Sequence, residues 1–538
     1  MRKRVIFELE GSGRTKPAVM NDGCTLVDLI AAAGNKLKVK PKRLLLDGTP
    51  LTEESITELE AGSKLVVCTH GHDCRLWLNS VCKGSNAETM PEISKSQPSA
   101  SEPLDGQNRN SHSDPGAQDE GVRNRPLGNG EVDVTILAKK SCLESEAIDQ
   151  LKRTLIDFPS MRVAAGMPDL HPGPQFPIGA AFASEGEVMP FLVGSDVGCG
   201  MTLFPTSLKD RGPKKAQKWV SMLESMDGPW NGDVRPLLEE GNVRETSFDK
   251  DCLGTVGGGN HFAELQSVES VEDDDEFEKL GMNESKMYLL VHSGSRAYGA
   301  HILKQHLDSH GVKPLVEGSP EFDRYMEKHD NACAWAGCNR RLIAFRFLTA
   351  LGVDTSVVGN PVLDICHNNV VKMTSLLEDG RALWLHRKGA APADCGPVVI
   401  PGSRGAFSYL VLPTQNPSAQ RCAAYSLAHG AGRRWARGKA LAVGQTKYPN
   451  PKALTTTPLG SHVVCDDATL LYQEQPDAYK EIDEVIEDLE NAGLISVVAV
   501  LRPVITYKTK SPDRQGGSQK WKDDRKRASL IVPESGKV

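Results

Sequence analysis

The sequence predicts an α+β protein in which one large mixed domain follows a small strand-rich segment. Between residues 131 and 510, short apolar runs typical of strands alternate irregularly with helical patterns, unlike the regular repeat of a doubly wound sheet. A polar stretch, residues 83–130, separates this region from the first 70 residues. The 538 residues, of which 39% are hydrophobic, are enough for two or three domains and a large core.

The first 70 residues show a strand, a helix and then further strands. "RVIFELEG" (4–11) predicts a strand, and "TLVDLIAAAG" (25–34) has apolar residues at helical spacing. "RLLLDGTPL" (43–51) predicts a strand, a turn and a returning strand, and "SKLVV" (63–67) a closing strand. This order resembles a ubiquitin-like β-grasp domain over residues 1–70, whose function would be to bind an unknown protein partner.

Three segments outside the two predicted domains have unusual composition. Residues 83–130 lack Phe, Trp and Tyr and are dense in polar residues, so they cannot bury enough apolar surface to fold and are predicted to form a disordered linker. "CTHGHDC" (68–74) is either a metal clip or a polar strand end; its spacing fits no common zinc module, which favours the strand end. Residues 511–538 are mainly basic and are predicted to form a flexible tail.

The large domain is predicted to contain several strands and helices. The strand patterns are "VMPFLVG" (188–194), "MYLLVH" (287–292), "ALWLHRKG" (382–389), "SYLVL" (408–412) and "SVVAVLRP" (496–503). The helical patterns are a long one at 320–351 and shorter ones near 213–226, 419–441 and 479–491.

Composition excludes several classes of protein. A formal net charge of -7 argues against nonspecific coating of nucleic acid, although a local basic patch remains compatible with it. Thirteen scattered cysteines do not suggest a disulfide framework and indicate a reducing compartment, the cytoplasm or alternatively the nucleus. No apolar run approaches the roughly 18 residues that a membrane span requires, so no membrane association is expected.

Glycine-rich turns carrying polar side chains recur in this domain. In "FLVGSDVGCGMTLF" (191–204), Asp196 and Cys199 stand between glycines after an apolar run that predicts a buried strand. Four further stretches each contain a histidine: "GTVGGGNHFAE", "LLVHSGSR", "DICHNN" and "SLAHGAGRR". Junctions between strands and loops are where sites collect, so the five stretches together predict a binding site.

This set of motifs resembles the RtcB family of RNA-splicing ligases. The resemblance extends from "MRVAAGMPDLHPG" to "LRPVITYK" and includes, in order, "DVGCGM", "GGGNHFAE", "HSGSR", "HRKGAAPA", "IPGSRGAFSYLV" and "HGAGR". The variants "HPGPQFPIGAAF", "NHFAELQ" and "LRPVITYKT" resemble the branch associated with a peptide-release-factor homologue. The resemblance implies an RtcB-type mixed α/β catalytic domain over residues 131–510.

The resemblance implies a centre with two divalent ions, typically manganese. One ion would be held by Cys199, His292 and His367, and the other by Asp196, Cys199 and His261. One carboxylate, one thiolate and three imidazoles exceed what a single tetrahedral ion needs, so two ions sharing the Cys199 thiolate fit this count. The softness of these ligands alone would favour zinc. The identification of the ions as manganese is implied only by the family resemblance.

His429 in "HGAGR" matches the family's nucleophile, which would become guanylylated by GTP. Gly430, Ala431 and Gly432 carry little side-chain bulk and would let a nucleotide approach the backbone. Asn260 would contact a phosphate or the ribose.

Four further residues match the family's nucleotide site. Glu264 would accept hydrogen bonds from the N1–H and amine of guanine, Lys508 would donate to a guanine acceptor, and Ser403 and Ser408 would form the nucleotide-binding loop. The family usually ends at Lys-Gly, whereas this chain reads "YKTK" and continues. Lys508 could therefore also be a solvated charge, and the basic tail could cover the pocket or bind RNA phosphates.

Basic residues beside the motifs are expected to contact phosphate groups. They are Arg296, Arg387, Lys388, Arg404 and Arg433. His301, His306 and His310 fall in a polar helical pattern and are interpreted as surface residues.

The resemblance implies a GTP- and manganese-dependent ligase acting in tRNA splicing or RNA repair. It would join an RNA 3′-phosphate end to a 5′-hydroxyl end. A 2′,3′-cyclic phosphate end would first be hydrolysed to the 3′-phosphate. An archease-like activator would be a further partner. The alternatives are an enzyme that caps 3′-phosphates of RNA or DNA with guanylate, and a non-catalytic ubiquitin-like adaptor.

Overall fold

The computed structural model describes residues 132–510 and, from the first 68 residues, 3–9, 15–20, 29–30, 32–33, 43–46, 49–50 and 64–68. The predicted linker, the tail 511–538 and all of the "CTHGHDC" segment after Cys68 lie outside the described residues. The chain divides into two compact units, Met1–Gly116 and Ala117–Val538.

The first unit contains a five-stranded sheet. Its strands are β1 (Lys3–Leu9), β2 (Thr15–Met20), β3 (Arg43–Leu46), β4 (Thr49–Pro50) and β5 (Lys64–Cys68). They lie in the order β2-β1-β5-β3-β4, with β1 parallel to β5. The predicted strands are present, and β2 is an additional one. The assignment of this unit as ubiquitin-like stays a prediction.

The second unit is built on two large sheets. The eight-stranded sheet has the order β14 (Leu363–Cys366), β10 (Gly200–Pro205), β12 (Met287–Ser293), β11 (Phe262–Val271), β22 (Ile495–Thr509), β19 (Ser408–Pro413) and β18 (Val398–Pro401), and β21 (His462–Cys465) also pairs with β22. The five-stranded sheet has the order β15 (Asn368–Met373), β16 (Leu383–Lys388), β8 (Ile178–Ser184), β7 (Met161–His171) and β6 (Asp133–Ile136). Pairing is mainly antiparallel, which supports the predicted mixed α and β class.

The two large sheets face each other across the main core. Val163 and Ala165 of β7 lie in the same buried cluster as Tyr288 and Leu290 of β12. Successive side chains of a strand point to opposite faces of its sheet, and the intervening Leu289 accordingly belongs to a different cluster. Each sheet therefore has a second apolar face that requires its own cover.

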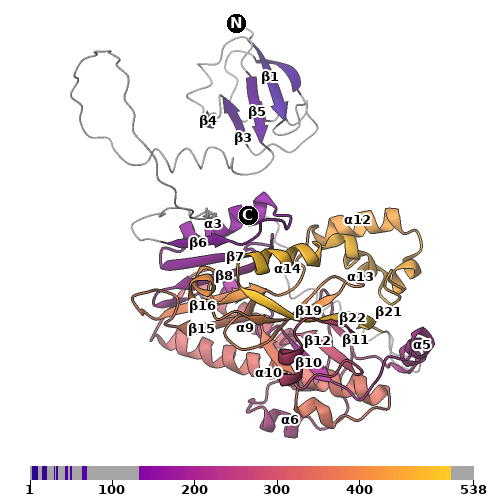
Figure 1. The fold of residues 1–538 in the computed structure, drawn as a ribbon. Helices are drawn as coiled ribbons and strands as arrows, with labels where there is room; N and C mark the ends of the chain where they lie inside the picture. The colour runs from indigo at the N-terminus through magenta and orange to yellow at the C-terminus, as the bar shows by residue number, and fades with distance from the viewer. Residues whose placement is uncertain are drawn as a thin grey trace, which may run out of the picture. The chain divides into compact units, whose positions relative to one another are not determined.

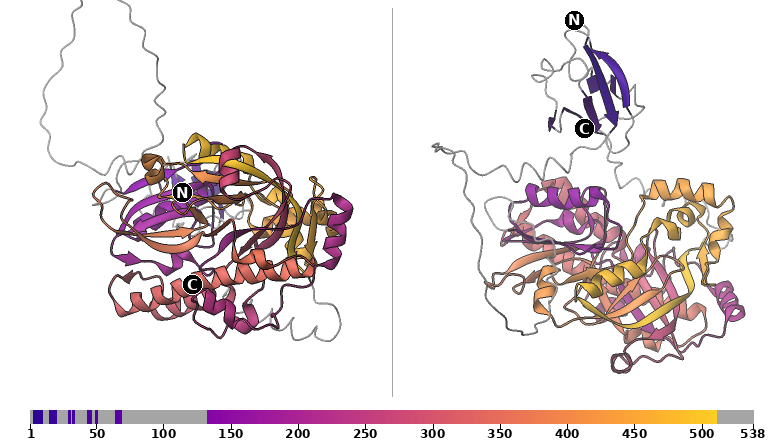
Figure 2. Two further views of the ribbon diagram at one scale, coloured as in Figure 1. Left: turned by 60° about the horizontal axis from the view of Figure 1, so that its bottom comes forward. Right: turned by 45° about the horizontal axis from the view of Figure 1, so that its top comes forward.

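Helices supply that cover. The long helix α10 (Pro320–Ala350) packs Phe347 and Ile343 in the cluster on the outer face of the eight-stranded sheet, and it runs along the sheets in Figure 2. Helix α3 (Ser145–Asp157) packs Leu151 against the outer face of the five-stranded sheet. The layers are helix, sheet, sheet and helix (Figure 1). The prediction of a helix at 320–351 is confirmed; its start is capped by Ser319, which accepts a hydrogen bond from the Phe322 amide.

Shorter elements complete the unit. The helices are α4 (Pro190–Val193), α5 (Pro213–Met222), α6 (Arg235–Glu240), α7 (Asp249–Cys252), α8 (Asp274–Lys279), α9 (Arg296–His310), α11 (Pro417–Cys422), α12 (Arg437–Lys447), α13 (Ala468–Gln473) and α14 (Ile482–Asn491). Two small sheets pair β17 (Ala390–Pro392) with β20 (Ser426–Ala428), and β9 (Glu187–Val188) with β13 (Leu315–Val316). Among the described residues, none of the helices has the length and apolar character that crossing a membrane requires.

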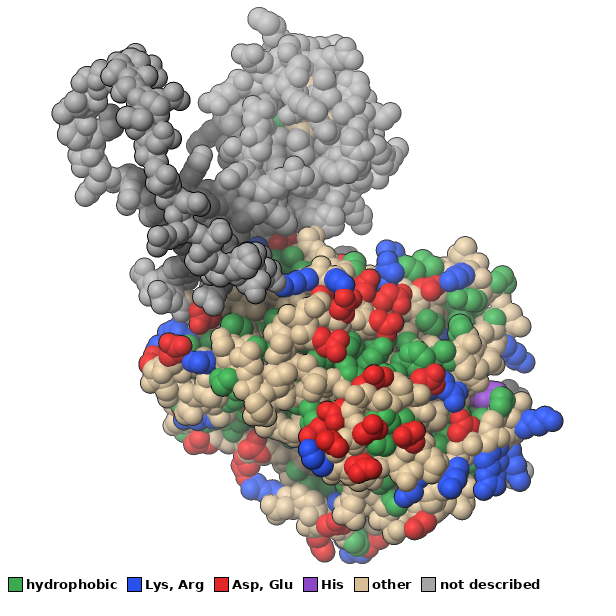
Figure 3. Space-filling model, in the orientation of Figure 1, with side chains coloured by type: hydrophobic (Ala, Val, Ile, Leu, Met, Phe, Trp, Pro, Cys, Tyr) green, Lys and Arg blue, Asp and Glu red, His purple; other side chains and the backbone are tan. Residues whose placement is uncertain are grey.

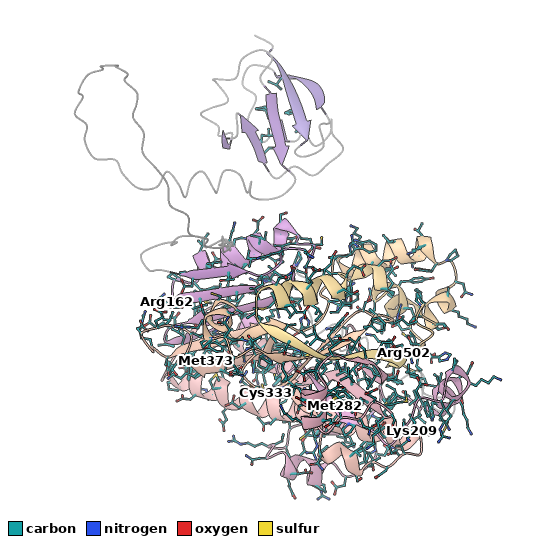
Figure 4. All side chains as sticks on the ribbon, viewed as in Figure 1. Arg162, Lys209, Met282, Cys333, Met373 and Arg502 are labelled. Carbon is teal, nitrogen blue, oxygen red and sulfur yellow. The ribbon has the colours of Figure 1, made fainter. Side chains whose placement is uncertain are left out.

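Strand β22 joins the parts of the eight-stranded sheet. It has 15 residues and pairs with β11, β19 and β21. Arg502, labelled in Figure 4, stands on this strand and forms ion pairs with Asp210 at 2.9 Å and Glu269 at 3.0 Å. The sheet is therefore continuous only through β22.

Two element predictions were wrong. "VMPFLVG" was predicted as a strand, but only Val188 is in one; Pro190, at the first position of α4, starts a helical turn and has no amide hydrogen to donate to a ladder. The helix predicted near 419–441 is interrupted because Ala424 and Tyr425 have positive φ angles and β20 then pairs with β17.

The interpretation of three histidines as surface residues was wrong for one of them. His306 is 5% exposed, whereas His301 is exposed. Because His306 follows Ile302 by four residues, both lie on the face of α9 that turns inward.

Candidate metal and nucleotide site

The loop between α4 and β10 presents Asp196 and Cys199. Gly198 has a φ of +79°, which supports the turn predicted here. Gly200 is required for a different reason: a Cβ atom at this position would lie 2.0 Å from the carbonyl oxygen of Ile365 on neighbouring β14. The amide of Cys199 donates to the carbonyl of Asp196 at 3.1 Å, which closes the turn.

The register of three neighbouring strands brings Cys199, His292 and His367 together. Gly200 at the start of β10 pairs with Ser293 on β12 and with Cys366 on β14. The residues adjacent to these pairs are the three candidate ligands. Sγ of Cys199 lies 3.3 Å from Nε2 of His292, which lies 3.2 Å from Nε2 of His367.

A second group shares Cys199. Sγ of Cys199 lies 3.3 Å from Nε2 of His261, which lies 2.8 Å from Oδ2 of Asp196. His261 directly precedes β11, whose Phe262 pairs with His292. The other ring nitrogen of His261 lies 3.2 Å from the carbonyl oxygen of Val256 and 3.3 Å from Nη1 of Arg296, so these contacts hold the ring with Nε2 directed at Cys199 and Asp196.

The two groups have the spacing and chemistry of metal sites. Ligands held about 2.0–2.3 Å from one ion stand roughly 3–4 Å apart, close to the separations found here. Both groups, Cys199–His292–His367 and Asp196–Cys199–His261, have their ligand atoms within 4.8 Å of one another. Oδ1 of Asp196 is buried without a hydrogen-bond partner. Buried polar atoms normally have a partner, so this oxygen is suited to bind a metal ion.

Burial controls the ionisation of these groups. It lowers the pKa values of His292 and His367 well below the usual range, an effect reinforced by the neighbouring histidines, so both rings are neutral and able to bind a metal. Burial would raise the pKa of Asp196, but His261 and Arg296 more than offset this and lower it. Burial and Asp196 raise the pKa of Cys199 well above normal, and a bound cation would reverse that preference.

A pocket of about 160 Å³ opens beside the metal groups. The predicted site residues that line it are Asn260, His292, Ser403, Arg404, His429, Gly430, Ala431, Gly432, Arg433 and Lys508. Residues from the loops after β18 and β20 thus meet residues of β11, β12 and β22 at one place. Sequence reasoning missed His171, Phe262, Arg437, Glu474 and Tyr479, which also line the pocket.

The predicted site residues Glu264 and Ser408 do not line the pocket; both are buried. Nε2 of Gln266 donates to Oε1 of Glu264 and to Oγ of Ser408, both at 2.8 Å. Thr506 donates to the other oxygen of Glu264. Burial raises the pKa of Glu264, while the two hydrogen bonds and Lys508 oppose the rise.

Lys508 is buried in the pocket wall, so it is not a solvated charge. Its Nζ donates to the carbonyl of Gly259 at 2.8 Å, and burial lowers its pKa to about 8 although Glu474 opposes the shift. The end of β22 is held by Asp227, which accepts from the Lys510 amide at 2.8 Å and the Thr509 hydroxyl at 3.0 Å. The departure from the family's usual ending is therefore an anchored continuation of the strand.

The basic residues predicted to contact phosphate divide into two sets. Arg404 and Arg433 line the pocket, and Nη1 of Arg404 is buried without a partner. Arg387 is buried elsewhere and bonds Asp394 at 3.0 Å and the Ser426 hydroxyl at 3.1 Å. Lys388 and Arg296 lie beside the metal groups rather than in the pocket lining. Burial lowers the pKa of Lys388 to about 8 although Asp196 and Cys199 oppose the shift, and its Nζ donates to the Val193 carbonyl at 3.3 Å. Nη1 of Arg296 lies 3.3 Å from Nδ1 of His261.

Charge on the pocket contrasts with charge elsewhere. Acidic side chains gather over α14 on the face shown in Figure 3, and that helix carries Asp483, Glu484, Glu487 and Glu490. The pocket is lined instead by Arg404, Arg433, Arg437 and Lys508, with Glu474 as its carboxylate. An acidic protein therefore has a local basic site, as an anionic substrate requires.

Asp169 supports His429, and the sequence analysis did not select it. Nδ1 of His429 lies 2.6 Å from Oδ2 of Asp169, an ion-pair distance, although the alignment falls short of hydrogen-bond geometry. The same oxygen accepts from the His429 amide at 3.2 Å. Asp169 is fully buried at the end of β7, far from His429 in sequence, so no local pattern connects them. The ring of His429 also lies 4.9 Å from that of His367.

If His429 is the nucleophile that the resemblance implies, we expect Asp169→Asn to slow its guanylylation by GTP about 100- to 10,000-fold, the range for a group that orients a reacting imidazole. The carboxylate favours a proton on Nδ1 and so leaves Nε2 with its lone pair; a neutral amide would not. The measurement is the single-turnover rate of adduct formation. Metal content and melting temperature serve as controls, and an unchanged rate in a folded variant would contradict the role.

The candidate metal centre lies beside a basic pocket in which His429 is close to the Asp169 carboxylate. Such an arrangement is typical of enzymes that act on phosphate groups. The family model described as "tRNA-splicing ligase RtcB" matches residues 153–229 and 231–509. The chain is 43% identical over 379 residues to RNA-splicing ligase RtcB2 of Escherichia coli, covering 70% of this chain and 95% of that protein. It is 29% identical over 446 residues to the tRNA-splicing ligase RtcB of Archaeoglobus fulgidus, covering 67% and 91%. The chain therefore belongs to the RtcB family of RNA-splicing ligases, and the resemblance found in the sequence is confirmed.

The chain is 26% identical over 432 residues to RNA-splicing ligase RtcB homolog 1 of Entamoeba dispar, covering 65% of this chain and 80% of that protein. It is therefore more similar in sequence to the Escherichia coli RtcB2 than to the archaeal or the Entamoeba protein. Its place in the release-factor-associated branch stays a prediction.

Proposed function

We propose that this family member uses GTP and two manganese ions to join RNA ends through a guanylylated His429. It would join a 3′-phosphate end, or a 2′,3′-cyclic phosphate end, to a 5′-hydroxyl end in tRNA splicing or RNA repair. The observation that carries the proposal is the position of His429, with its Nδ1 beside Asp169 and its ring beside the candidate ligand His367.

The candidate ligands fit a pair of divalent ions. Cys199, His292 and His367 would hold one ion, and Asp196, Cys199 and His261 the other. Bound there, the ions would polarise phosphoryl oxygens and orient the reacting ends. The donor set would also suit zinc, so manganese rests on the family resemblance.

His429 carries the covalent chemistry in this proposal. Its Nε2 attacks the α-phosphate of GTP, a nitrogen–phosphorus bond forms, and pyrophosphate leaves. The guanylate then passes from Nε2 to an oxygen of the RNA 3′-phosphate. Attack of the 5′-hydroxyl on that phosphate forms the phosphodiester and releases GMP. Asp169 holds the imidazole throughout, and Arg404, Arg433 and Lys508 supply positive charge around the phosphates.

The nucleotide would occupy the pocket beside His429. Gly430, Ala431 and Gly432 leave room for it, while Asn260 and Ser403 offer polar contacts. Phe262 and Tyr479 supply aromatic surface for a base. Glu264, with Ser408 and Lys508, would read guanine.

We expect Glu264→Ala to weaken use of GTP by one to two orders of magnitude or more and to narrow the preference for GTP over ATP. Guanine offers the carboxylate two hydrogen bonds, each worth roughly 1.5–3 kcal/mol, whereas ATP presents an unprotonated N1. The measurement is competition between GTP and ATP in the labelling reaction.

Thr506→Val is the matched control, because it removes a hydrogen bond to the same carboxylate and keeps the carboxylate itself. It should retain most of the preference for GTP. If Glu264→Ala retains it as well, guanine is read elsewhere.

The function is tested with labelled GTP, manganese and an RNA pair with 3′-phosphate and 5′-hydroxyl ends. Covalent labelling of the protein followed by a joined RNA product is the expected result. Labelled 3′ ends without joining would indicate a capping enzyme, and an unlabelled protein would indicate an adaptor. Adding an archease-like activator tests whether that partner is needed. The protein partner of the first unit is a separate proposal, tested by binding.

A further inference from the structure

A second cavity, of about 370 Å³, lies between α9 and α10. Ile302, His306 and His310 of α9 line it together with Tyr325 and Lys328 of α10. None of its lining residues belongs to the lining of the nucleotide pocket. Its volume is within the range of sites for small organic molecules, about 300–1,000 Å³.

Two buried polar side chains in its wall lack a well-formed hydrogen bond. Tyr325 is 6% exposed and its hydroxyl has no hydrogen-bond partner; His306 is 5% exposed, and the Lys313 backbone lies near its ring at a geometry short of a well-formed hydrogen bond. An unsatisfied buried polar group costs about 1–3 kcal/mol, so such groups normally have a partner. Burial and the adjacent His310 lower the pKa of His306 to about 4, which the backbone of Lys313 only partly opposes. The ring is therefore neutral and has one N–H to donate.

The wall lacks the ligand set of a protein zinc site among the described residues. His306 and His310 are four residues apart on one helix, with ring centroids 5.5 Å apart. Among the described residues, however, no group of three His, Cys, Asp or Glu donors forms here. A protein zinc site uses at least three such ligands.

The cavity lining holds the carboxylates Asp308 and Glu321 and the cations Arg324 and Lys328, and all of these except Lys328 are in ion pairs between described residues. Arg324 is paired with Glu321 at 2.7 Å, and Asp308 is paired with Lys304 at 2.6 Å. Lys328 donates to the neutral side chain of Gln305 at 2.8 Å, and none of the ion pairs found among the described residues includes it. The Lys328 cation therefore lies in a wall that also holds the unpartnered Tyr325 hydroxyl and the neutral His306 ring.

The surroundings also offer apolar contact. Ile302 and Leu315 line the cavity. Leu307, Val312 and Val316 belong to the same stretch of chain and are exposed, and among the described residues only Ile156 is another large hydrophobic residue so exposed. The apolar side chains of the lining, Ile302 and Leu315, suit a ligand with an apolar part.

We propose that this cavity is a second ligand site that binds a small organic anion, a phosphate monoester or carboxylate on an apolar body. The anionic group accepts hydrogen bonds from Tyr325 and His306 and is neutralised by Lys328. The apolar body packs against Ile302 and Leu315.

The test is calorimetric titration of the full chain with phenyl phosphate, benzoate and benzyl alcohol, which share a ring and differ in the head group. Binding of the anions, and not of the alcohol, is expected. Tyr325→Phe and His306→Phe should each weaken binding at this site about 10- to 100-fold, because each removes a hydrogen bond to a charged group. Comparing phenyl phosphate with benzoate identifies which anion the site takes.

The nucleotide pocket is a competing site for phosphates, so a crystal soaked with the stronger ligand locates the binding. His301→Phe, the same substitution on the exposed side of α9, is the control and should bind as wild type does. All three variants should label with GTP normally, and Tyr325→Phe, which removes an unpaired hydroxyl, should melt no lower than wild type. Titrations unaffected by both cavity substitutions, equal binding of benzyl alcohol, or a cavity holding only water would overturn the proposal.

Discussion

His429→Ala should abolish transfer of labelled GMP from GTP to the protein. The imidazole that lies between Asp169 and His367, and that is proposed to form the nitrogen–phosphorus bond, is then missing. The fold should persist, because His429 is in a loop after β20 and its ring is partly exposed to the pocket. The measurement is acid-labile covalent label after incubation with GTP and manganese, with joining of RNA ends assayed in parallel.

The matched control is His171→Ala. His171 lines the same pocket, and burial lowers its pKa to about 3, so it is also a neutral imidazole. If His429 is the nucleophile, this variant still forms the adduct. An acid-labile GMP adduct on the His429→Ala protein, or its loss only in the His171 variant, would refute the assignment.

Cys199→Ser should lower the affinity for both metal ions, whereas Asp196→Ala should mainly affect one. Cys199 belongs to both ligand groups and Asp196 to one. A neutral hydroxyl is a poor substitute for a thiolate, and we expect a loss beyond the roughly 10- to 100-fold caused by removing an outer-shell partner of a metal. The measurement is metal content after dialysis against a fixed concentration of free manganese.

Cys338→Ser serves as the control for this experiment. Cys338 is buried on α10 with its thiol directed at the Leu237 carbonyl, away from both groups, so its substitution should leave two ions bound. Full occupancy of both sites in the Cys199→Ser protein would rule out a shared thiolate.

Local patterns predicted much of the fold. The apolar runs at β12, β16, β19 and β22 are strands, and the helix at 320–351 is present, because their periodicity and caps are properties of the nearby sequence. The "VMPFLVG" prediction was wrong because a fully buried run carries no alternation that distinguishes strand from helix. The helix near 419–441 was wrong because pairing of β20 with β17 is not a local property.

The residues of the candidate site also divide into those that a local motif indicates and those that only the folded chain brings together. The metal groups could be proposed from motifs, since each contributes a chemically distinctive side chain, and the strand register then explains why they meet. Asp169 could not be found this way: an aspartate in "MPDLHPG" has no feature that indicates a histidine 260 positions later. His306 was misread because its polarity suggested surface, while only packing against α10 reveals that it is buried.

The central position of β22 has a consequence for biosynthesis. Without residues 495–509, the eight-stranded sheet would fall into two fragments and the single strand β21: one fragment, β14-β10-β12-β11, adjoins the candidate metal ligands, and the other, β19-β18, adjoins the Ser403 loop. A ribosome must therefore translate nearly the whole catalytic unit before metal ligands and nucleotide loop can be aligned. A chain terminated earlier would expose two unpaired sheet edges, which promote aggregation. Incomplete translation products should consequently be cleared by proteolysis and have no partial ligase activity.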